Sequence, residues 1–513
     1  MPKLREISFS ARNRHVATMG FGSLLLAIGA VSVGWLPPLF NISVNPILEA
    51  LRASDAGLLL GRISAVVGGA IVLHTWLRIG VDVLRGQLSS LKTLWSCLLA
   101  GIIPLVLMPP LFSRDLYSYI AQGRLMDHGI NPYTHGVGAM PGWFQLGADP
   151  MWAEAPTPYG PLYIAFQGFV AHVLPTAPWW SMLALKSSAI VGLLLIAAAV
   201  TRLAEQHGLS VPAVFWLTAL NPLMLLHLVA GGHNDSLMIA GMLWAFVFAN
   251  NRKTFLALVA ITAAAGIKPI ALLALPFVAL AILPRKTTWK AIVGSWIACA
   301  ALVIGALSAI GAALGLGLGW IGALSTPGSV RTLLSPATAF GQVIGFIGNG
   351  FNLDITDGAI SLSRAIFMAT ALVFLALIAL RPEGQAPLRQ AGLAFTAVVA
   401  LSPVMQPWYL LWALPLVVCS GLARSWHLRT IVLGTSFFVI YALADMNVVT
   451  DSAIDATDFI SIFAAGLIVL VVLLASKRER ELVIGDQYAL GLKPVGDDAE
   501  AIAQAQKMTV SLR

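Results

Sequence analysis

Fourteen apolar runs follow one another along the chain, from about residue 16 to residue 476. A transmembrane helix needs about 20 apolar residues to cross a hydrocarbon core of about 30 Å, and most of the runs approach that length. Only 11% of the residues are charged and 58% are hydrophobic, whereas soluble domains carry about 25% charged residues. The sequence therefore predicts an all-α polytopic membrane protein with about 14 transmembrane helices (range about 12–14). It excludes a disordered chain, a disulfide scaffold and a DNA-binding domain.

The positions of the basic residues predict how these helices are oriented. If the N-terminus is cytoplasmic and successive runs alternate in direction, most of the 31 Lys and Arg residues fall in cytoplasmic segments, as the positive-inside rule requires. Topology thus accounts for most of the net charge of +8, and no nucleic-acid partner is expected. We expect a multi-pass protein of the bacterial plasma membrane with both termini cytoplasmic, and a motif-free cytoplasmic tail at residues 477–513.

Two segments on the predicted exterior (periplasmic) face, residues 113–180 and 316–358, are much longer than the other loops. Both are rich in apolar and aromatic residues, so we expect short amphipathic helices that lie flat on the outer membrane interface, one of them over residues 115–128. Loops of this length usually carry function. Basic residues that oppose the positive-inside rule, among them Lys268 and Arg331, lie on the same face. Chemistry is therefore expected there.

Three predicted helical hairpins turn on this face at polar tips: GGHND at 231–235, GIKP at 266–269 and SPVMQPWY at 402–409. The arms beside Lys268 have about 15 residues, or about 22 Å of helix, so Lys268 would lie below the outer membrane surface. An ionisable residue at that depth is by default a functional hypothesis, and the alternative is that Lys268 pairs with Asp235 only to join helices. A cavity that combines Asp115 with Lys268 and His233 suits displacement of a phosphate leaving group by a hydroxyl. Outside a cell, the activated donor would be attached to a lipid.

Four motifs carry a family resemblance: RDLYSYIAQGRLMDHGINPY, NPLMLLHLVAGGHNDSLM, GIKP and SPVMQPWYLLW. Over about residues 15–476 the chain resembles the actinobacterial polyprenol-phosphate-mannose-dependent α-(1→6)-mannopyranosyltransferases of the MptA/MptB type, which are GT-C membrane glycosyltransferases. The resemblance implies a GT-C fold with a transmembrane catalytic domain at residues 1–476. It implies transfer of mannose from polyprenyl-phosphate-mannose to the 6-hydroxyl of a lipid-anchored α-(1→6)-mannan, the backbone of lipomannan and lipoarabinomannan. A β-linked donor and an α-linked product imply inversion in one step, and no cofactor and no metal ion are expected.

The resemblance also implies that an acidic residue in the first long exterior loop is the catalytic base, and Asp115 matches that position. Asp115 could instead serve only in an ion pair with Arg114 or Arg124. The candidates for binding the donor phosphate are Lys268, His233 and Arg331, with Arg331 able to supply a bidentate fork. The candidates for contacts with the sugar or the prenyl chain are Tyr119, Gln122, Asn234, Asp235, Gln406, Trp408 and Tyr409.

Several of these candidates have a structural alternative. Asp235 could cap the following helix, His233 could cap a helix or bond Asn234, and Gln122 could only shape its loop. Trp408 and Tyr409 could belong to the aromatic belt at the membrane interface.

Three other functions remain possible at this point. A transporter or lipid flippase also contains intramembrane charge and broken helices, although the polar residues here gather at one face rather than at the midplane. A GT-C transferase with another sugar or acceptor would use the same motifs. A purely structural membrane protein gives no reason for Lys268 to lie at depth.

Overall fold

A computed structural model describes residues 2–284, 287–324, 332–380, 387–422 and 424–444, and the regular elements of these residues are all helices. Six are long and apolar enough to cross a membrane: α1 (Pro2–Val33), α3 (Asp55–Leu84), α7 (Pro178–Gln206), α12 (Trp289–Ala313), α15 (Thr356–Ala379) and α18 (Ser425–Ala444). The shorter apolar ones are α4 (Leu91–Ile102) with η2 (Ile103–Leu105), α6 (Pro161–Val173), α9 (Asp235–Asn250), α10 (Thr254–Ile267), η6 (Pro269–Ala274) with α11 (Leu275–Ile282), α16 (Pro387–Leu401), and η8 (Pro407–Tyr409) with α17 (Leu410–Cys419). The prediction of an all-α polytopic membrane protein is confirmed. The run at 458–476 and the tail at 477–513 lie outside the described residues.

The apolar run at 211–230 is broken rather than forming one helix. It consists of α8 (Val211–Leu217), a short turn, and η5 (Met224–Ala230), which is π-helical. Pro222 has no backbone N–H to continue a helix, and the Asn221 side chain accepts a hydrogen bond from the N–H of Leu223 at 3.0 Å. Single π-helical turns are frequent at functional sites, and η5 leads directly into the GGHND turn.

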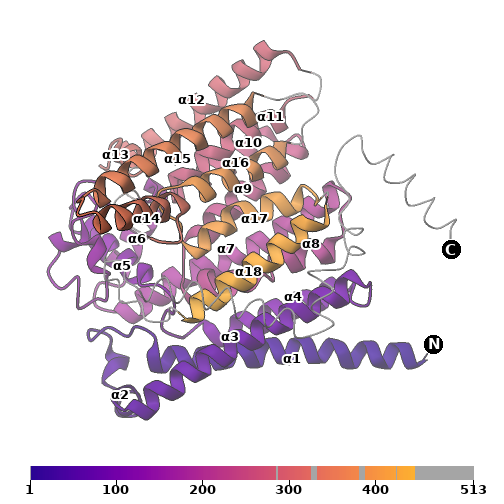
Figure 1. Cartoon of the computed structure of the whole chain (residues 1–513), viewed down its shortest axis with the longest axis vertical. Coiled ribbons are helices and arrows are strands. Elements are labelled where there is room, and N and C mark those ends of the chain that lie inside the picture. Colours follow the sequence, from indigo (N-terminus) through magenta and orange to yellow (C-terminus); the bar gives the residue numbers. More distant parts are fainter. Residues whose placement is uncertain (1, 285–286, 325–331, 381–386, 423, 445–513) are drawn as a thin grey trace.

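The helices form a bundle in which turns and short helices gather at the ends (Figure 1). Helix α1 packs against α3 and α4, α9 packs between α7 and α10, and α16 packs against α17. The short helices α2 (Pro46–Ala53), α5 (Asp115–Asp127), α6, α13 (Gly319–Gly322) and α14 (Pro336–Gly350) lie together at the end opposite the N mark in Figure 1. The described parts of the two long loops predicted for one face therefore lie at one end of the bundle.

We expected the first of these loops to lie flat on the outer membrane interface, but protein covers most of its first helix. A short helix does begin at Asp115, but α5 packs against α6 and α7, and its side chains are buried on most sides from Leu116 to Leu125. Apolar and aromatic composition predicts burial without saying whether lipid or protein covers the segment. Here the protein itself covers it, because α6 lies within the same loop and packs along α5. In the second loop, α14 packs against α15.

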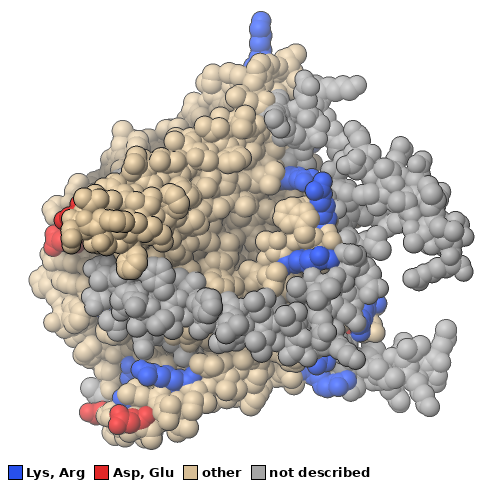
Figure 2. All heavy atoms as spheres, viewed as in Figure 1, with Lys and Arg blue, Asp and Glu red and all other residues tan. Residues whose placement is uncertain are grey.

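Charged side chains separate along the bundle in the view of Figure 2. Most of the visible Lys and Arg side chains lie toward the end that carries the N mark of Figure 1, and the visible Asp and Glu side chains lie at the opposite end. Between them the surface is largely uncharged. The gathering of Lys and Arg at one end is what the positive-inside rule predicts for a membrane protein.

Candidate functional site

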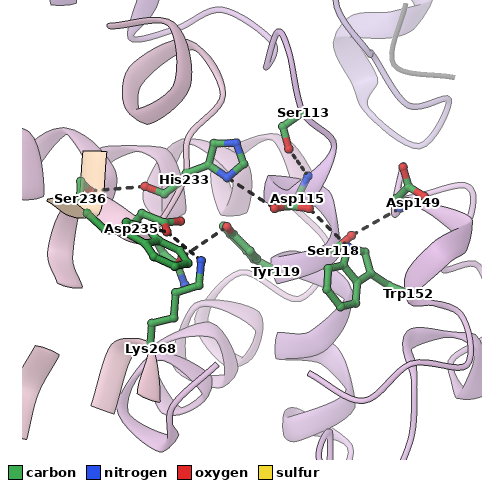
Figure 3. Close-up of polar contacts among 12 residues, drawn as sticks. Ser113, Asp115, Ser118, Tyr119, Asp149, Trp152, His233, Asp235, Ser236 and Lys268 are labelled. Atoms are coloured by element: carbon green, nitrogen blue, oxygen red, sulfur yellow. Dashed lines mark hydrogen bonds and ion pairs between the residues drawn. The ribbon is translucent and has the colours of Figure 1, made fainter. Parts of the chain in front are cut away.

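The start of α5 and the turn before α9 bring two polar side chains together (Figure 3). Asp115 is the first residue of α5, and its Oδ2 lies 3.4 Å from Nδ1 of His233. Gly232 gives the turn its shape, because its φ of +72° lies in the left-handed region that favours glycine. The turn also packs closely on α5, since a Cβ atom at Gly232 would lie 3.0 Å from Leu116 Cδ2. His233 is fully buried, whereas the Asp115 side chain remains 18% exposed, so the carboxylate is the accessible member of the pair.

Neither neighbouring arginine is paired with Asp115. Arg114 donates from Nε to the carbonyl of Gly147 at 3.0 Å and from its terminal nitrogen to the carbonyl of Ala148 at 2.8 Å, and its guanidinium stacks on Trp35. Arg124 donates to a carbonyl at the far end of the loop, that of Pro175. The alternative that Asp115 serves only in an ion pair with one of these arginines is therefore wrong. Arg114 instead holds the loop in place around Asp115.

The surroundings of Asp115 favour its ionised form. Burial alone would raise the pKa of this carboxyl, but the hydrogen bond and charge of His233, the charge of Lys268 and the indole N–H of Trp152 outweigh burial and leave the pKa below its ordinary value. The Trp152 Nε1 atom donates to Asp115 Oδ1 at 3.3 Å. A carboxylate that is deprotonated and partly exposed can accept a proton from a bound hydroxyl.

A second acidic side chain lies next to this pair, on the first turn of α9. Lys268 Nζ donates to Asp235 Oδ1 at 2.8 Å, and Trp412 Nε1 donates to the same oxygen at 2.6 Å. The side chains of Lys268 and Asp235 are 11% and 0% exposed. The pairing that we considered as a structural alternative for Lys268 is thus present. The carboxylate of Asp235 is engaged across the bundle rather than in a cap of its own helix.

Three aromatic rings surround the Lys268 ammonium. Its Nζ lies 5.0 Å from the ring centre of Trp412, 5.5 Å from that of Tyr409 and 5.8 Å from that of Tyr159, all within the range of cation–π attraction. Tyr159 reaches this place because the first loop is tied to the GIKP turn: the N–H of Gly160 donates to the carbonyl of Ile267 at 2.9 Å. The loop and the hairpin therefore form one surface around Lys268.

The third polar turn supplies a stacked aromatic wall. The Trp408 indole lies on the His233 imidazole with ring centres 3.9 Å apart, and Tyr409 lies on Trp412 at 4.0 Å. Both residues therefore pack on the polar cluster itself. The alternative that they belong only to an interfacial aromatic belt does not explain these contacts.

Several buried polar atoms of this cluster have no hydrogen-bond partner among the described residues. They are Nδ2 of Asn234, Oδ2 of Asp235, Nε2 of His233 and both ring nitrogens of His227. Asn234 Oδ1 accepts only a long hydrogen bond, 3.5 Å, from the Tyr119 hydroxyl. A buried polar atom without a partner costs free energy, so such a concentration is typical of a site that a polar ligand completes.

Comparisons with known proteins identify the family of the chain. A family model described as alpha-(1->6)-mannopyranosyltransferase, N-terminal domain, matches residues 17–284, and a model described as MptB C-terminal domain matches residues 337–447. The chain belongs to the α-(1→6)-mannopyranosyltransferase family. It is similar to a probable alpha-(1->6)-mannopyranosyltransferase of Mycolicibacterium smegmatis, with 32% identity over 77% of this chain and 76% of the relative.

Two further relatives of the family show the same breadth of similarity. Alpha-(1->6)-mannopyranosyltransferase A of Mycobacterium tuberculosis is 30% identical over 82% of this chain and 83% of its own length. Alpha-(1->6)-mannopyranosyltransferase B of Corynebacterium glutamicum is 28% identical over 83% of this chain and 76% of its own length. No solved structure matches the chain.

The other candidate residues of this mannopyranosyltransferase family member do not contact the cluster of Asp115, His233 and Lys268 among the described residues. Gln122 is buried, and its Oε1 accepts a hydrogen bond from Gln167 of α6 at 3.2 Å, so it joins α5 to α6. Gln406 is half-buried at the residue before η8. Arg331 lies outside the described residues. Within the described residues, no three His, Cys, Asp or Glu side chains lie close enough together to hold a metal ion.

Four residues of the site were not among the candidates from the sequence. Trp412 lies four residues after Trp408, a spacing that places both on one side of a helix, and that signal could have identified it. Tyr159 and Trp152 lie in irregular loop sequence without a period. His227 lies in an apolar run, where a lone histidine gives no signal of the turn that it faces.

Proposed function

We propose that this chain is a membrane mannosyltransferase that transfers mannose from polyprenyl-phosphate-mannose to the 6-hydroxyl of a lipid-anchored α-(1→6)-mannan, in the synthesis of lipomannan and lipoarabinomannan. Membership of the α-(1→6)-mannopyranosyltransferase family supports mannosyl transfer and the α-(1→6) linkage. The lipid-linked phosphate donor is supported by the position of the site. An ionised carboxylate and an ammonium lie together beside short hairpins, at the end of a membrane-spanning bundle.

The observation that carries this proposal is the contact of Asp115 with His233 beside Lys268. In the proposed reaction, the 6-hydroxyl oxygen of the acceptor attacks C1 of the donor mannose from the face opposite the phosphate. The bond between C1 and the phosphate oxygen breaks, and its electron pair leaves with polyprenyl phosphate. Asp115 takes the hydroxyl proton, and the anomeric carbon is inverted.

The basic residues act on the leaving group in this scheme. The departing phosphate gains one negative charge, and Lys268 and His233 offset it by charge-assisted hydrogen bonds. Arg331 serves as a further phosphate ligand. The stacked side chains of Trp408 and Tyr409 provide an apolar wall for the sugar ring, while Asn234 and Asp235 present polar atoms to its hydroxyls. We assign Tyr119 to the same wall and Gln406 to its edge.

The proposal places the site on the exterior face of the plasma membrane, with both termini in the cytoplasm. The gathering of the visible Lys and Arg side chains toward the end that carries the N-terminus supports this orientation. We assign residues 1–476 to a GT-C transmembrane catalytic domain, since an acidic residue follows the third membrane-spanning segment at the start of the first long loop. Residues 477–513 form the cytoplasmic tail in this scheme.

Purified protein with radiolabelled polyprenyl-phosphate-mannose and a short α-(1→6)-mannoside tests the proposal. We expect a product extended by one mannose, and a loss of about a hundredfold to ten-thousandfold in rate on Asp115→Asn, the usual contribution of a general base. Asp127→Asn is the matched control, because Asp127 ends the same helix and pairs with His172 away from the cluster. Lipid scrambling without product would favour a flippase instead, and near-normal transfer by Asp115→Asn would refute the base.

A further inference from the structure

The second long loop is joined to the aromatic wall of the site through side-chain hydroxyls. They donate to backbone carbonyls of the SPVMQP segment, residues 402–407, which leads directly into Trp408. Three such hydrogen bonds are present among the described residues: Ser335 donates to Ser402 at 2.7 Å, Thr338 to Pro403 at 2.7 Å and Thr332 to Met405 at 3.3 Å. We call these three donors the hydroxyl cluster.

The SPVMQP segment cannot hold its shape through its own backbone hydrogen bonds. Pro403 and Pro407 have no N–H to donate. A proline also restricts the residue before it to extended conformations, and Gln406 is extended, with φ −112° and ψ 150°. The segment therefore forms neither helix nor strand between α16 and η8. Its carbonyls depend on donors from other parts of the chain, and the hydroxyl cluster provides them.

Two members of the hydroxyl cluster are fully buried and are engaged on both sides. Ser335 Oγ caps α14, because it accepts a hydrogen bond from the N–H of Thr338 at 3.2 Å. Thr338 Oγ1 accepts from Nε of Arg364 on α15 at 3.0 Å. A hydroxyl has a single proton, so these contacts leave the proton of each hydroxyl for the SPVMQP segment. The cluster therefore joins α14 and α15 to that segment.

The SPVMQP segment in turn carries the residue that packs on the polar cluster. The Trp408 indole is stacked on the His233 imidazole with ring centres 3.9 Å apart, and His233 Nδ1 lies 3.4 Å from Asp115 Oδ2. Met405, whose carbonyl the hydroxyl cluster holds, lies three residues before Trp408. A displacement of the segment would therefore move Trp408 and, through the stacked rings, the partner of Asp115.

The hairpin that carries the hydroxyl cluster lies at the periphery of the bundle. Helix α14 packs against α15, and α15 packs against α16, while Phe346 of α14 and Leu372 of α15 are exposed. Helix α9, by contrast, packs between α7 and α10. The loss of one hydrogen bond from so peripheral a hairpin should leave the bundle folded. Its effect on the site can therefore be measured separately from an effect on the whole fold.

We propose that Ser335 and Thr338 are positioning residues of the transferase: they fix the SPVMQP segment so that Trp408 holds His233 against Asp115. Neither residue contacts the reacting atoms, and both act through the stacked rings. The inference rests on the proposed function, because it gives the second long loop a part in the reaction that we assign to Asp115.

Variants that remove one hydroxyl test this assignment. Thr338→Val removes the donor to Pro403 and keeps the shape of the side chain, and Thr338→Ser restores a hydroxyl. Ser335→Ala is the second variant, so that the test does not depend on one protein. Ser363→Ala is the matched control, because Ser363 of α15 is also buried and donates at 2.7 Å to the carbonyl of Ala337, the residue before Thr338. It joins the same turn of α14 to α15 without touching the SPVMQP segment.

We expect Thr338→Val and Ser335→Ala to lower kcat/KM by about tenfold to a hundredfold, the loss that a small misplacement in an active site causes. Because His233 lowers the pKa of Asp115, its displacement should also move the acid limb of the kcat/KM profile to higher pH. Thr338→Ser and Ser363→Ala should keep the wild-type rate and limb. The four variants should unfold at similar temperatures in detergent.

Hydrogen exchange at Tyr409 gives a second measurement that does not depend on activity. Its N–H donates to the Gln406 carbonyl at 2.9 Å, so its exchange reports the opening of the wall. We expect exchange about fivefold faster in Thr338→Val, the factor that one neutral hydrogen bond contributes, and wild-type exchange in Ser363→Ala.

Three results would overturn the assignment of Ser335 and Thr338. They are wild-type kinetics in Thr338→Val and Ser335→Ala, an equal loss of rate in Ser363→Ala, and a loss of rate in which the acid limb and the exchange of Tyr409 do not move. A wild-type protein that transfers no mannose would instead refute the proposed function. The exchange of Tyr409 in Thr338→Val and Ser363→Ala would then still decide whether the hydroxyl cluster fixes the wall.

Discussion

Removing the charges of the buried Lys268–Asp235 pair, first singly and then together, tests whether Lys268 acts on substrate or only joins two helices. At 2.8 Å the attraction of the two charges is about 6 kcal/mol with an effective dielectric constant of about 20. Much of this is offset by the desolvation of both groups. Breaking such a pair by removing one partner usually costs about 3–5 kcal/mol, because the other charge is left buried and unpaired.

The geometry predicts that the two single variants lose different amounts of stability. Lys268→Met leaves the Asp235 carboxylate fully buried, with Trp412 as its remaining donor among the described residues, so its cost should lie at the upper end of that range. Asp235→Asn keeps an oxygen for Trp412 and leaves Lys268 at 11% exposure, so its cost should lie at the lower end. The double variant buries no unpaired charge, and we expect it to recover most of the lost stability.

Thermal unfolding in detergent measures stability, and mannosyl transfer measured on the same preparations separates the two roles. If Lys268 binds the donor phosphate, the double variant regains stability but transfers no faster than Lys268→Met alone. Recovery of both stability and transfer in the double variant would refute the role of Lys268 in catalysis. A double variant as unstable as the single variants would refute the assumption that the pair acts as one unit.

The other predictions concern the surroundings of Asp115, the buried Lys186 of α7 and the donor phosphate. The pKa of Asp115 is held below its ordinary value of about 4. The rate of transfer should therefore fall only when the pH drops through that lowered pKa, because Asp115 is then protonated and cannot act as the base. Trp152→Phe removes one donor to it and should move the acid limb of the rate profile to higher pH, and an unmoved limb would show that the indole N–H is not involved. Lys186→Met removes the ammonium that donates to the Met108 carbonyl at 2.7 Å and should lower the free energy of unfolding by about 1–3 kcal/mol, with an unchanged melting midpoint as the contrary result. Arg331→Gln should raise KM for the donor. Arg331→Lys should give an intermediate KM, since lysine keeps the charge without the bidentate fork. Equal KM values in the wild-type protein and both variants would exclude Arg331 from the phosphate site.

Membrane-spanning helices could be predicted from the sequence because their signal is local. Each run needs only enough consecutive apolar residues, and thirteen of the fourteen runs fall on helices in the described residues. The break at Asn221 could not be placed, although Pro222 hinted at it, because membrane helices tolerate proline where neighbouring groups satisfy the backbone. The burial of α5 could not be predicted either, since it depends on α6 folding back along it.

The polar site could be predicted in part because charged residues are rare in this chain. Asp115, His233 and Lys268 stand out as polar residues at turns between apolar runs, and the structure brings the first two into contact and the third beside them. Of the two tryptophans that donate to the carboxylates, Trp412 could have been recognised from its spacing after Trp408, whereas Trp152 lies in irregular loop sequence and is one of 15 tryptophans in the chain. A sequence reveals a rare charged residue more readily than it reveals the residues that form hydrogen bonds with it.

The charges of the site give a reason to expect a further cation from outside this cluster. Asp115 and Asp235 contribute two negative charges. Among the described residues, Lys268 is the permanently charged cation that contacts Asp235. A mannosyl phosphodiester brings one more negative charge, and its departure as a monoester adds another. A partly buried site that holds this much negative charge is costly unless cations compensate it. The donor phosphate therefore requires at least one additional basic group. Arg331 is the candidate, because it lies in the second long loop, which the sequence predicts on the same face as the site.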